Sequence, residues 1–265
     1  KWIVGTTDTD YQADPNTPLA TREDVTYIIN QANRVLEPKL DRSQVIGVFA
    51  GLRPLVSTDP DSPTTELSRE HVVDHPVPGF VTIAGGKYTT YRVMAEDAVD
   101  AAVSDLKRIV PESCTETLPV IGAEGYEVLR NKASEFALRL GITVVSINHL
   151  IDRYGSLFEE VLELAAEDRS LVEPIIAGLP YLKAEIVYAA SHEGALSVSD
   201  VLSRRTRIAF EDINQGVSVA DEVATLIGNE LGWSESDREQ SLSEYIAQVQ
   251  LQNDQLSSLV TEKVS

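Results

Sequence analysis

The sequence predicts an α+β protein in which a short portion of strands and helices precedes an all-helical domain. Residues 80–106 have the pattern of a strand, a Gly-Gly turn and an amphipathic helix. Residues 109–124 contain two prolines and a glycine, which is typical of a linker. From residue 126 onward, apolar residues recur at helical spacing and β-branched runs are few. The predicted parts are therefore a first domain at 1–108, a linker at 109–124 and a helical domain at 125–265.

The chain is expected to begin with a strand and a capped helix. Residues 2–6 have the composition of a strand, so the sequence opens directly on a predicted strand. This start suggests that the chain is a fragment cut from a longer protein. Thr21 is placed to cap a helix, and Asp24 occupies the capping-box position three residues later. Apolar residues from 25 to 36 form one face of that helix, and Pro38 ends it.

Residues 45–52 form an almost unbroken apolar run, which predicts a strand buried on both faces. Arg53 follows directly, and Pro54 keeps it in an extended conformation. An arginine at the end of a buried strand either pairs with a structural carboxylate or points into a cleft, and this pattern leaves both open. Residues 69–75 are expected to form the next strand, with a Pro- and Gly-containing turn before the strand at 80–84.

The Gly-Gly turn at Gly85 and Gly86 leads from this strand into a helix start, where unpaired amides and the helix dipole favour anions. Lys87, Thr89 and Thr90 add a cation and two hydroxyls to the same place. An ordinary β-turn-α connection explains the local pattern equally well. The spacing excludes a P-loop, and since no two glycines are separated by one residue, a Rossmann dinucleotide fingerprint is excluded too.

The helical domain is expected to contain seven helices. Its basic run, Arg204, Arg205 and Arg207, could bind an anion, but internal ion pairs are the favoured role on a domain so rich in acidic residues. The expected helices lie at residues 129–140, 144–154, 157–166, 182–192, 198–208, 219–231 and 236–260.

Composition restricts the function classes. The chain has 42 acidic and 22 basic residues and a net charge of −20, which argues against nucleic acid as a partner. Its single cysteine, Cys114, excludes an internal disulfide and a cysteine-rich zinc site, and suits a reducing cytoplasm. No apolar run approaches the length of a membrane-spanning helix. We expect no metal site.

Five motifs in order resemble the FAD-dependent, quinone-linked glycerol-3-phosphate dehydrogenases. They lie at residues 5–11, 51–55, 61–63 with 68–70, 85–92 and 202–206. The resemblance covers essentially the whole chain and corresponds to the C-terminal half of that family. It implies that residues 2–52 finish a cap domain and that residues 80–106 complete the flavin domain. The Gly-rich unit that grips the ADP part of FAD is not among these motifs, so we expect the fragment alone to bind neither FAD nor substrate and to be inactive.

The resemblance also implies residue roles. Arg53 corresponds to the arginine beside the substrate hydroxyl, where it would act in catalysis and binding. Arg69 and Lys87 correspond to cations near the substrate phosphate. Gly86, Lys87, Thr89 and Thr90 correspond to the helix start against the flavin. The implied partners are glycerol 3-phosphate and a quinone, and the resemblance leaves open a homo-oligomer and peripheral contact with the inner face of the cell membrane. Tyr88 stands where many relatives have leucine.

Two other classes stay open. The helical domain shows no convincing catalytic constellation, so the chain could serve as a non-catalytic interaction or dimerisation module. Another FAD amine or hydroxyacid oxidase would share the Gly-Gly turn, but it would have no reason to place Arg53, Arg69 and Lys87 together. Convergence of these three side chains would favour a phosphorylated substrate.

Overall fold

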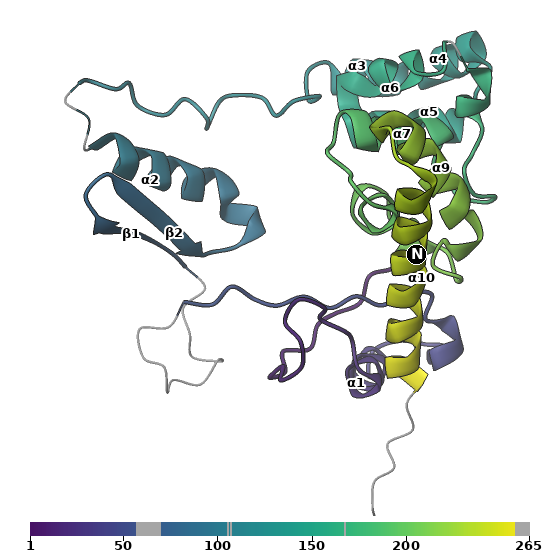
Figure 1. Cartoon of the computed structure of the whole chain (residues 1–265), viewed down its shortest axis with the longest axis horizontal. Coiled ribbons are helices and arrows are strands. Elements are labelled where there is room, and N and C mark those ends of the chain that lie inside the picture. Colours follow the sequence, from purple (N-terminus) through teal and green to yellow (C-terminus); the bar gives the residue numbers. More distant parts are fainter. Residues whose placement is uncertain (57–69, 105, 107, 167, 258–265) are drawn as a thin grey trace, which may run out of the picture. The chain divides into compact units, whose positions relative to one another are not determined.

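The computed structural model describes residues 1–56, 70–104, 106, 108–166 and 168–257, and their fold is mostly helical with one small sheet. These residues confirm the predicted α+β class. They divide into two compact units (Figure 1), which are described separately below. The helical unit comprises residues 1–8, 19–50 and 121–265, and the hairpin unit comprises residues 9–18 and 51–120.

The hairpin unit is built on two antiparallel strands, β1 (His71–Val77) and β2 (Phe80–Gly85), which pair with His71 opposite Gly85. A single 3₁₀ turn, Tyr88–Thr90, leads into helix α2 (Tyr91–Ser104), which lies along the hairpin (Figure 1). The predicted strand, glycine turn and helix are thereby confirmed.

Two predicted strands are wrong. Residues 2–6 and 45–52 form neither helix nor strand, and Phe49 and Leu52 keep 65% and 49% of their surface exposed. An apolar run becomes a strand only when another strand satisfies its backbone amides and carbonyls. Among the described residues, the sheet contains β1 and β2 alone. Arg53 therefore follows a segment without strand pairing, and its side chain is exposed.

Helix α1 (Arg22–Ala32) begins as predicted. The Thr21 hydroxyl accepts a hydrogen bond from the Asp24 amide at 3.1 Å, and the Asp24 carboxylate accepts one from the Thr21 amide at 3.2 Å. The helix ends earlier than its apolar stripe, at residue 32. The Asn33 side chain binds both backbone groups of Leu40, which redirects the chain before Pro38 can act as the terminator.

The remaining helices follow the predicted order, with two breaks. The expected helix at 129–140 divides at Lys132, and the one at 198–208 contains a π-helical turn, Asp200–Arg205, that ends at buried Thr206. The Thr206 hydroxyl donates to the carbonyl of Val201 at 2.8 Å, which closes the wide turn. The helices are α3 (Tyr126–Asn131), α4 (Ala133–Leu140), α5 (Val144–Tyr154), α6 (Phe158–Glu163), α7 (Lys183–Ser191), α8 (Ile208–Glu211), α9 (Ala220–Leu231) and α10 (Glu235–Ser257).

Helix α7 is the centre of the helical unit. Ile186, Ala189 and Ala190 pack into one apolar cluster with α9 and α10, whereas Ala184 and Tyr188 pack into a second with α4, α5 and α6. A helix that is buried nearly all round carries apolar residues on every face. The sequence Lys-Ala-Glu-Ile-Val-Tyr-Ala-Ala-Ser meets this requirement at every inward position except the glutamate. That residue, Glu185, is completely buried.

The predicted linker, residues 109–124, contains neither helix nor strand. Each half is attached to a different unit. The Thr115 hydroxyl accepts a hydrogen bond from Arg92 of α2 at 3.2 Å, and the carbonyl of Gly122 accepts one from the Ser156 amide at 2.9 Å. The domain bounds themselves stay a prediction.

Replacing Thr143 with alanine should lower the free energy of unfolding of the chain by about 1 kcal/mol, because Thr143 caps α5. Its hydroxyl accepts a hydrogen bond from the Ser146 amide at 3.0 Å. Urea denaturation followed by circular dichroism measures the change. Thr117→Ala is the control, since that exposed threonine caps no helix. Equal losses in both variants would contradict the capping role.

Candidate functional site

The Gly-Gly turn at the end of β2 has a backbone that favours glycine at both positions. Gly85 and Gly86 have φ angles of +77° and +81°, a left-handed region that residues with a Cβ rarely adopt. A Cβ on Gly86 would overlap the sulfur of Met94 and lie 3.1 Å from the Cβ of His71. The glycine is therefore needed for packing against β1 and α2, whether or not a ligand approaches it.

Gly85 brings together the segments that carry the three predicted cations. A Cβ placed on Gly85 would lie 2.7 Å from the Val56 side chain, 2.9 Å from the carbonyl oxygen of Glu70 and 3.5 Å from that of Pro54. Pro54 and Glu70 directly follow Arg53 and Arg69 in the sequence, and Lys87 lies two residues after Gly85. The backbones of all three segments thus meet at one turn.

Of the three predicted cations, the structure describes the side chains of two. Arg53 and Lys87 are exposed, and Lys87 has an extended backbone with a φ of −131°. Arg69 lies outside the described residues. Convergence of the three cationic groups, as distinct from that of their backbones, stays a prediction.

The two threonines of the turn differ in what they bind. The Thr90 amide and hydroxyl both donate to the carbonyl of Lys87, each at 3.0 Å, so Thr90 closes the 3₁₀ turn at the start of α2. Thr89 is exposed. A glycine turn followed by an exposed helix start is a surface on which a planar, partly anionic group can rest, so these residues fit the edge of a flavin.

Sequence reasoning did not include His71 among the site residues. It lies in β1 opposite Gly85, is partly buried, and its Nε2 is 2.7 Å from Oδ2 of Asp97 on α2. This residue therefore connects both layers of the hairpin unit under the Gly-Gly turn. A signal was present in the sequence, since residues 71 and 85 are equally far from Pro78 at the tip of the hairpin.

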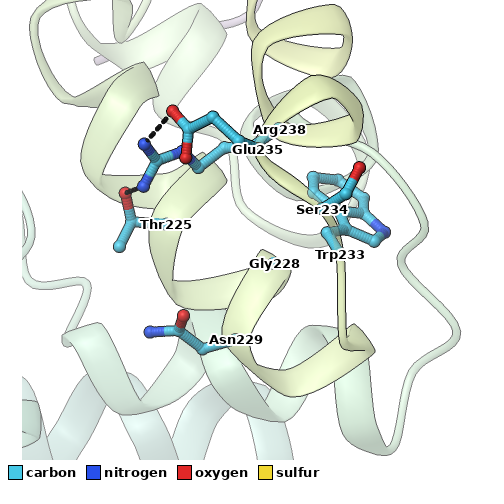
Figure 2. A pocket seen from close by; sticks show the side chains of 7 residues that line it. All are labelled: Thr225, Gly228, Asn229, Trp233, Ser234, Glu235 and Arg238. Carbon is cyan, nitrogen blue, oxygen red and sulfur yellow. Dashed lines mark hydrogen bonds and ion pairs between the residues drawn. The ribbon is translucent and has the colours of Figure 1, made fainter.

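The helical unit contains a small hollow of about 100 Å³ between α9 and the start of α10 (Figure 2). Its arginine is paired within the hollow. Arg238 donates to the hydroxyl of Thr225 at 3.2 Å and to the carboxylate of Glu235 at 2.5 Å. This hollow fits a structural contact between two helices and has no arrangement suited to chemistry. Across the described part of the chain, no group of three His, Cys, Asp or Glu side chains could hold a metal ion.

Comparison with known proteins identifies relatives for nearly the whole chain. Residues 113–238 match the family model of the C-terminal domain of alpha-glycerophosphate oxidase. The chain is 47% identical over 249 residues to "Glycerol-3-phosphate dehydrogenase 2" of Mycobacterium tuberculosis, covering 94% of this chain and 42% of that protein. The resemblance to glycerol-3-phosphate dehydrogenases is confirmed.

More distant glycerol-3-phosphate dehydrogenases match as well. The mitochondrial protein of Mus musculus is 35% identical over 251 residues, covering 91% of this chain and 33% of that protein. The crystal structure of the glycerol-3-phosphate dehydrogenase from Bacillus halodurans, complexed with FAD, superposes with a TM-score of 0.77 at 28% identity. The superposition covers 96% of this chain and 49% of the Bacillus halodurans chain. The chain therefore spans less than half the length of each of these relatives.

Proposed function

We propose that this chain is the C-terminal portion of an FAD-dependent glycerol-3-phosphate dehydrogenase. The full-length protein would oxidise glycerol 3-phosphate to dihydroxyacetone phosphate and pass the electrons to a quinone. The observation that supports this proposal most is the meeting of the backbones of Pro54, Glu70 and Gly85, which stand next to or near Arg53, Arg69 and Lys87 in the sequence. The 47% identity to a mycobacterial glycerol-3-phosphate dehydrogenase supports it.

In this proposal the three cations bind the substrate. Arg69 and Lys87 hold the phosphate, which charge-assisted hydrogen bonds from cations recognise. Arg53 holds the oxygen on C2, where a fixed planar cation favours negative charge developing as the hydroxyl loses its proton. FAD, when bound, accepts the hydride from C2. Gly86, Lys87, Thr89 and Thr90 orient the flavin edge at the start of α2.

Exposed apolar side chains on the hairpin unit support the proposal that this chain is part of a larger protein. Val72, Phe80, Tyr88 and Tyr91 are 45%, 54%, 92% and 56% exposed, although apolar and aromatic side chains of this size are usually covered. We infer that further protein covers these residues in the complete enzyme. Among the described residues, no helix is long and apolar enough to cross a membrane.

Replacing Lys87 with alanine in the full-length enzyme should lower kcat/KM for glycerol 3-phosphate by about 10-fold to 100-fold, because one charge-assisted phosphate contact contributes roughly 1.5–3 kcal/mol. Oxidation of unphosphorylated glycerol should change little. Arg69→Ala should behave in the same way. Steady-state kinetics with both substrates provides the test.

Lys132→Ala is the matched control, because Lys132 is an exposed lysine of the helical unit and the substitution removes the same charge. Equal losses for glycerol and glycerol 3-phosphate would show that Lys87 and Arg69 do not recognise the phosphate. That result would favour another FAD hydroxyacid or amine oxidase.

A further inference from the structure

The helical unit contains a second hollow, whose lining differs from that of the first. His149, Asp152 and Arg153 of α5 and Arg207, just before α8, line a space of about 260 Å³. Three of these four side chains are basic. This arrangement has no part in the proposed dehydrogenase site, and the inference drawn from it does not depend on that proposal.

The buried carboxylate of Glu185 fixes the ring of His149 through a hydrogen bond. Its Oε2 lies 2.9 Å from Nε2 of His149 and accepts a hydrogen bond from the Tyr154 hydroxyl at 3.3 Å. Its Oε1 accepts one from the Leu182 amide at 2.8 Å. Because both oxygens are engaged, Glu185 orients His149 without occupying the hollow.

The negative charge of Asp152 is partly balanced by residues that do not line the hollow. Its Oδ1 accepts a hydrogen bond from the Tyr126 hydroxyl at 2.6 Å and lies 3.4 Å from Nε of Arg130. This carboxylate therefore opposes an anion in the hollow much less than an unpaired aspartate would.

Arg153 is short of hydrogen-bond partners. Among the described residues, three buried side-chain polar atoms have no hydrogen-bond partner, and they are Nε of Arg153, Nη1 of Arg130 and Oε2 of Glu193. The carboxylates beside Arg153 are at ion-pair distance only, 4.0 Å for Glu185 and 3.5 Å for Glu193. Desolvation raises the pKa of the Glu193 carboxyl. A buried guanidinium donor left unpaired is costly, so the site favours an additional acceptor.

Arg207 can supply a second guanidinium from a fixed backbone. Its amide donates to the Tyr181 hydroxyl at 3.3 Å, and the Tyr181 ring packs edge-on against His149, with the ring centroids 4.7 Å apart. The side chain is 67% exposed, and its Nε lies 3.7 Å from Glu211, which is too far for a strong hydrogen bond. It can therefore turn toward the hollow at little cost.

We propose that this hollow binds an anion of the phosphate class, either inorganic phosphate or the phosphate of a monoester. Two guanidinium groups and an imidazole surround it, and planar guanidinium donors match phosphate oxygens in pairs. Arg153 lines the hollow beside the ring of His149, which Glu185 holds in place, and the exposed Arg207 can reorient toward it. Both guanidinium groups gain an acceptor when the anion binds.

Calorimetric titration of the purified chain with sodium phosphate tests the proposal, against sodium chloride at equal ionic strength. We expect saturable binding with a Kd of about 1 mM. The Arg207→Gln variant should bind phosphate at least about tenfold more weakly. A second titration with glycerol 3-phosphate distinguishes the two sources, because a monoester ligand would bind more tightly than inorganic phosphate.

The matched control is Arg204→Gln, which removes the same charge from a neighbouring exposed arginine that pairs with Asp200 and does not line the hollow. It should keep its phosphate affinity within about twofold. Circular dichroism verifies that both variants are folded. Absence of saturable phosphate binding by the unmodified chain, or equal weakening in both variants, would overturn the proposal.

Discussion

Replacing Arg53 with lysine should lower kcat of the full-length enzyme by about 100-fold while leaving KM for glycerol 3-phosphate close to its original value. Lysine keeps the charge but cannot reproduce the planar pair of donors. A contact that strengthens as the C2 hydroxyl loses its proton acts on turnover more than on binding. Steady-state kinetics with a quinone analogue measures both constants.

The matched control for Arg53 is Arg139→Lys. Arg139 pairs with Glu159 at 2.8 Å on the surface of the helical unit, so that substitution should leave both constants unchanged. An Arg53→Lys enzyme with full turnover and only a raised KM would make Arg53 a simple binding residue and refute its catalytic role.

Replacing Gly155 with alanine should lower the free energy of unfolding of the chain by about 4 kcal/mol or more. Gly155 ends α5 with φ +57° and ψ −128°, a conformation that only glycine adopts readily. A Cβ there would overlap the carbonyl oxygen of Gly122. The backbone at Gly122 and Gly155 would therefore have to separate, and the hydrogen bond from Ser156 to Gly122 would be lost.

Gly178→Ala is the control for Gly155. Gly178 also has a left-handed φ, +84°, but a Cβ there would meet nothing within 4 Å, so this substitution should cost only about 1 kcal/mol. Urea denaturation of both variants measures the difference. Similar losses in the two would show that the contact between Gly122 and Gly155 contributes little.

The basic run at residues 204–207 shows what a local sequence pattern can predict and what it cannot. Internal pairing was the favoured expectation, and Arg204 pairs with Asp200 while Arg205 donates to the carbonyl of Glu193 at 2.8 Å. The sequence indicated no difference between Arg207 and its neighbours. Only the packing of Tyr181 against His149 places Arg207 beside the second hollow, because those residues meet across the fold.

Helix starts and the glycine turn were determined by the sequence alone. Thr21 with Asp24 marked the beginning of α1, and the apolar spacing at 144–154 predicted α5 to the residue. The strand predicted at 80–84 forms β2, one residue longer, and leads into the turn and helix as expected. These signals are local, since a cap, a stripe and a turn involve residues within a few positions of one another.

The tertiary structure decided which apolar segments became strands and which glycines became irreplaceable. Residues 45–52 have a strand's composition, yet a strand exists only where a second one satisfies its backbone, and in the described part of the chain the two strands, β1 and β2, pair with each other. Likewise, Glu185 of α7 became the buried centre of a polar network because His149 and Tyr154 of α5 bond to it. Both outcomes depend on residues distant in sequence, which local patterns cannot specify.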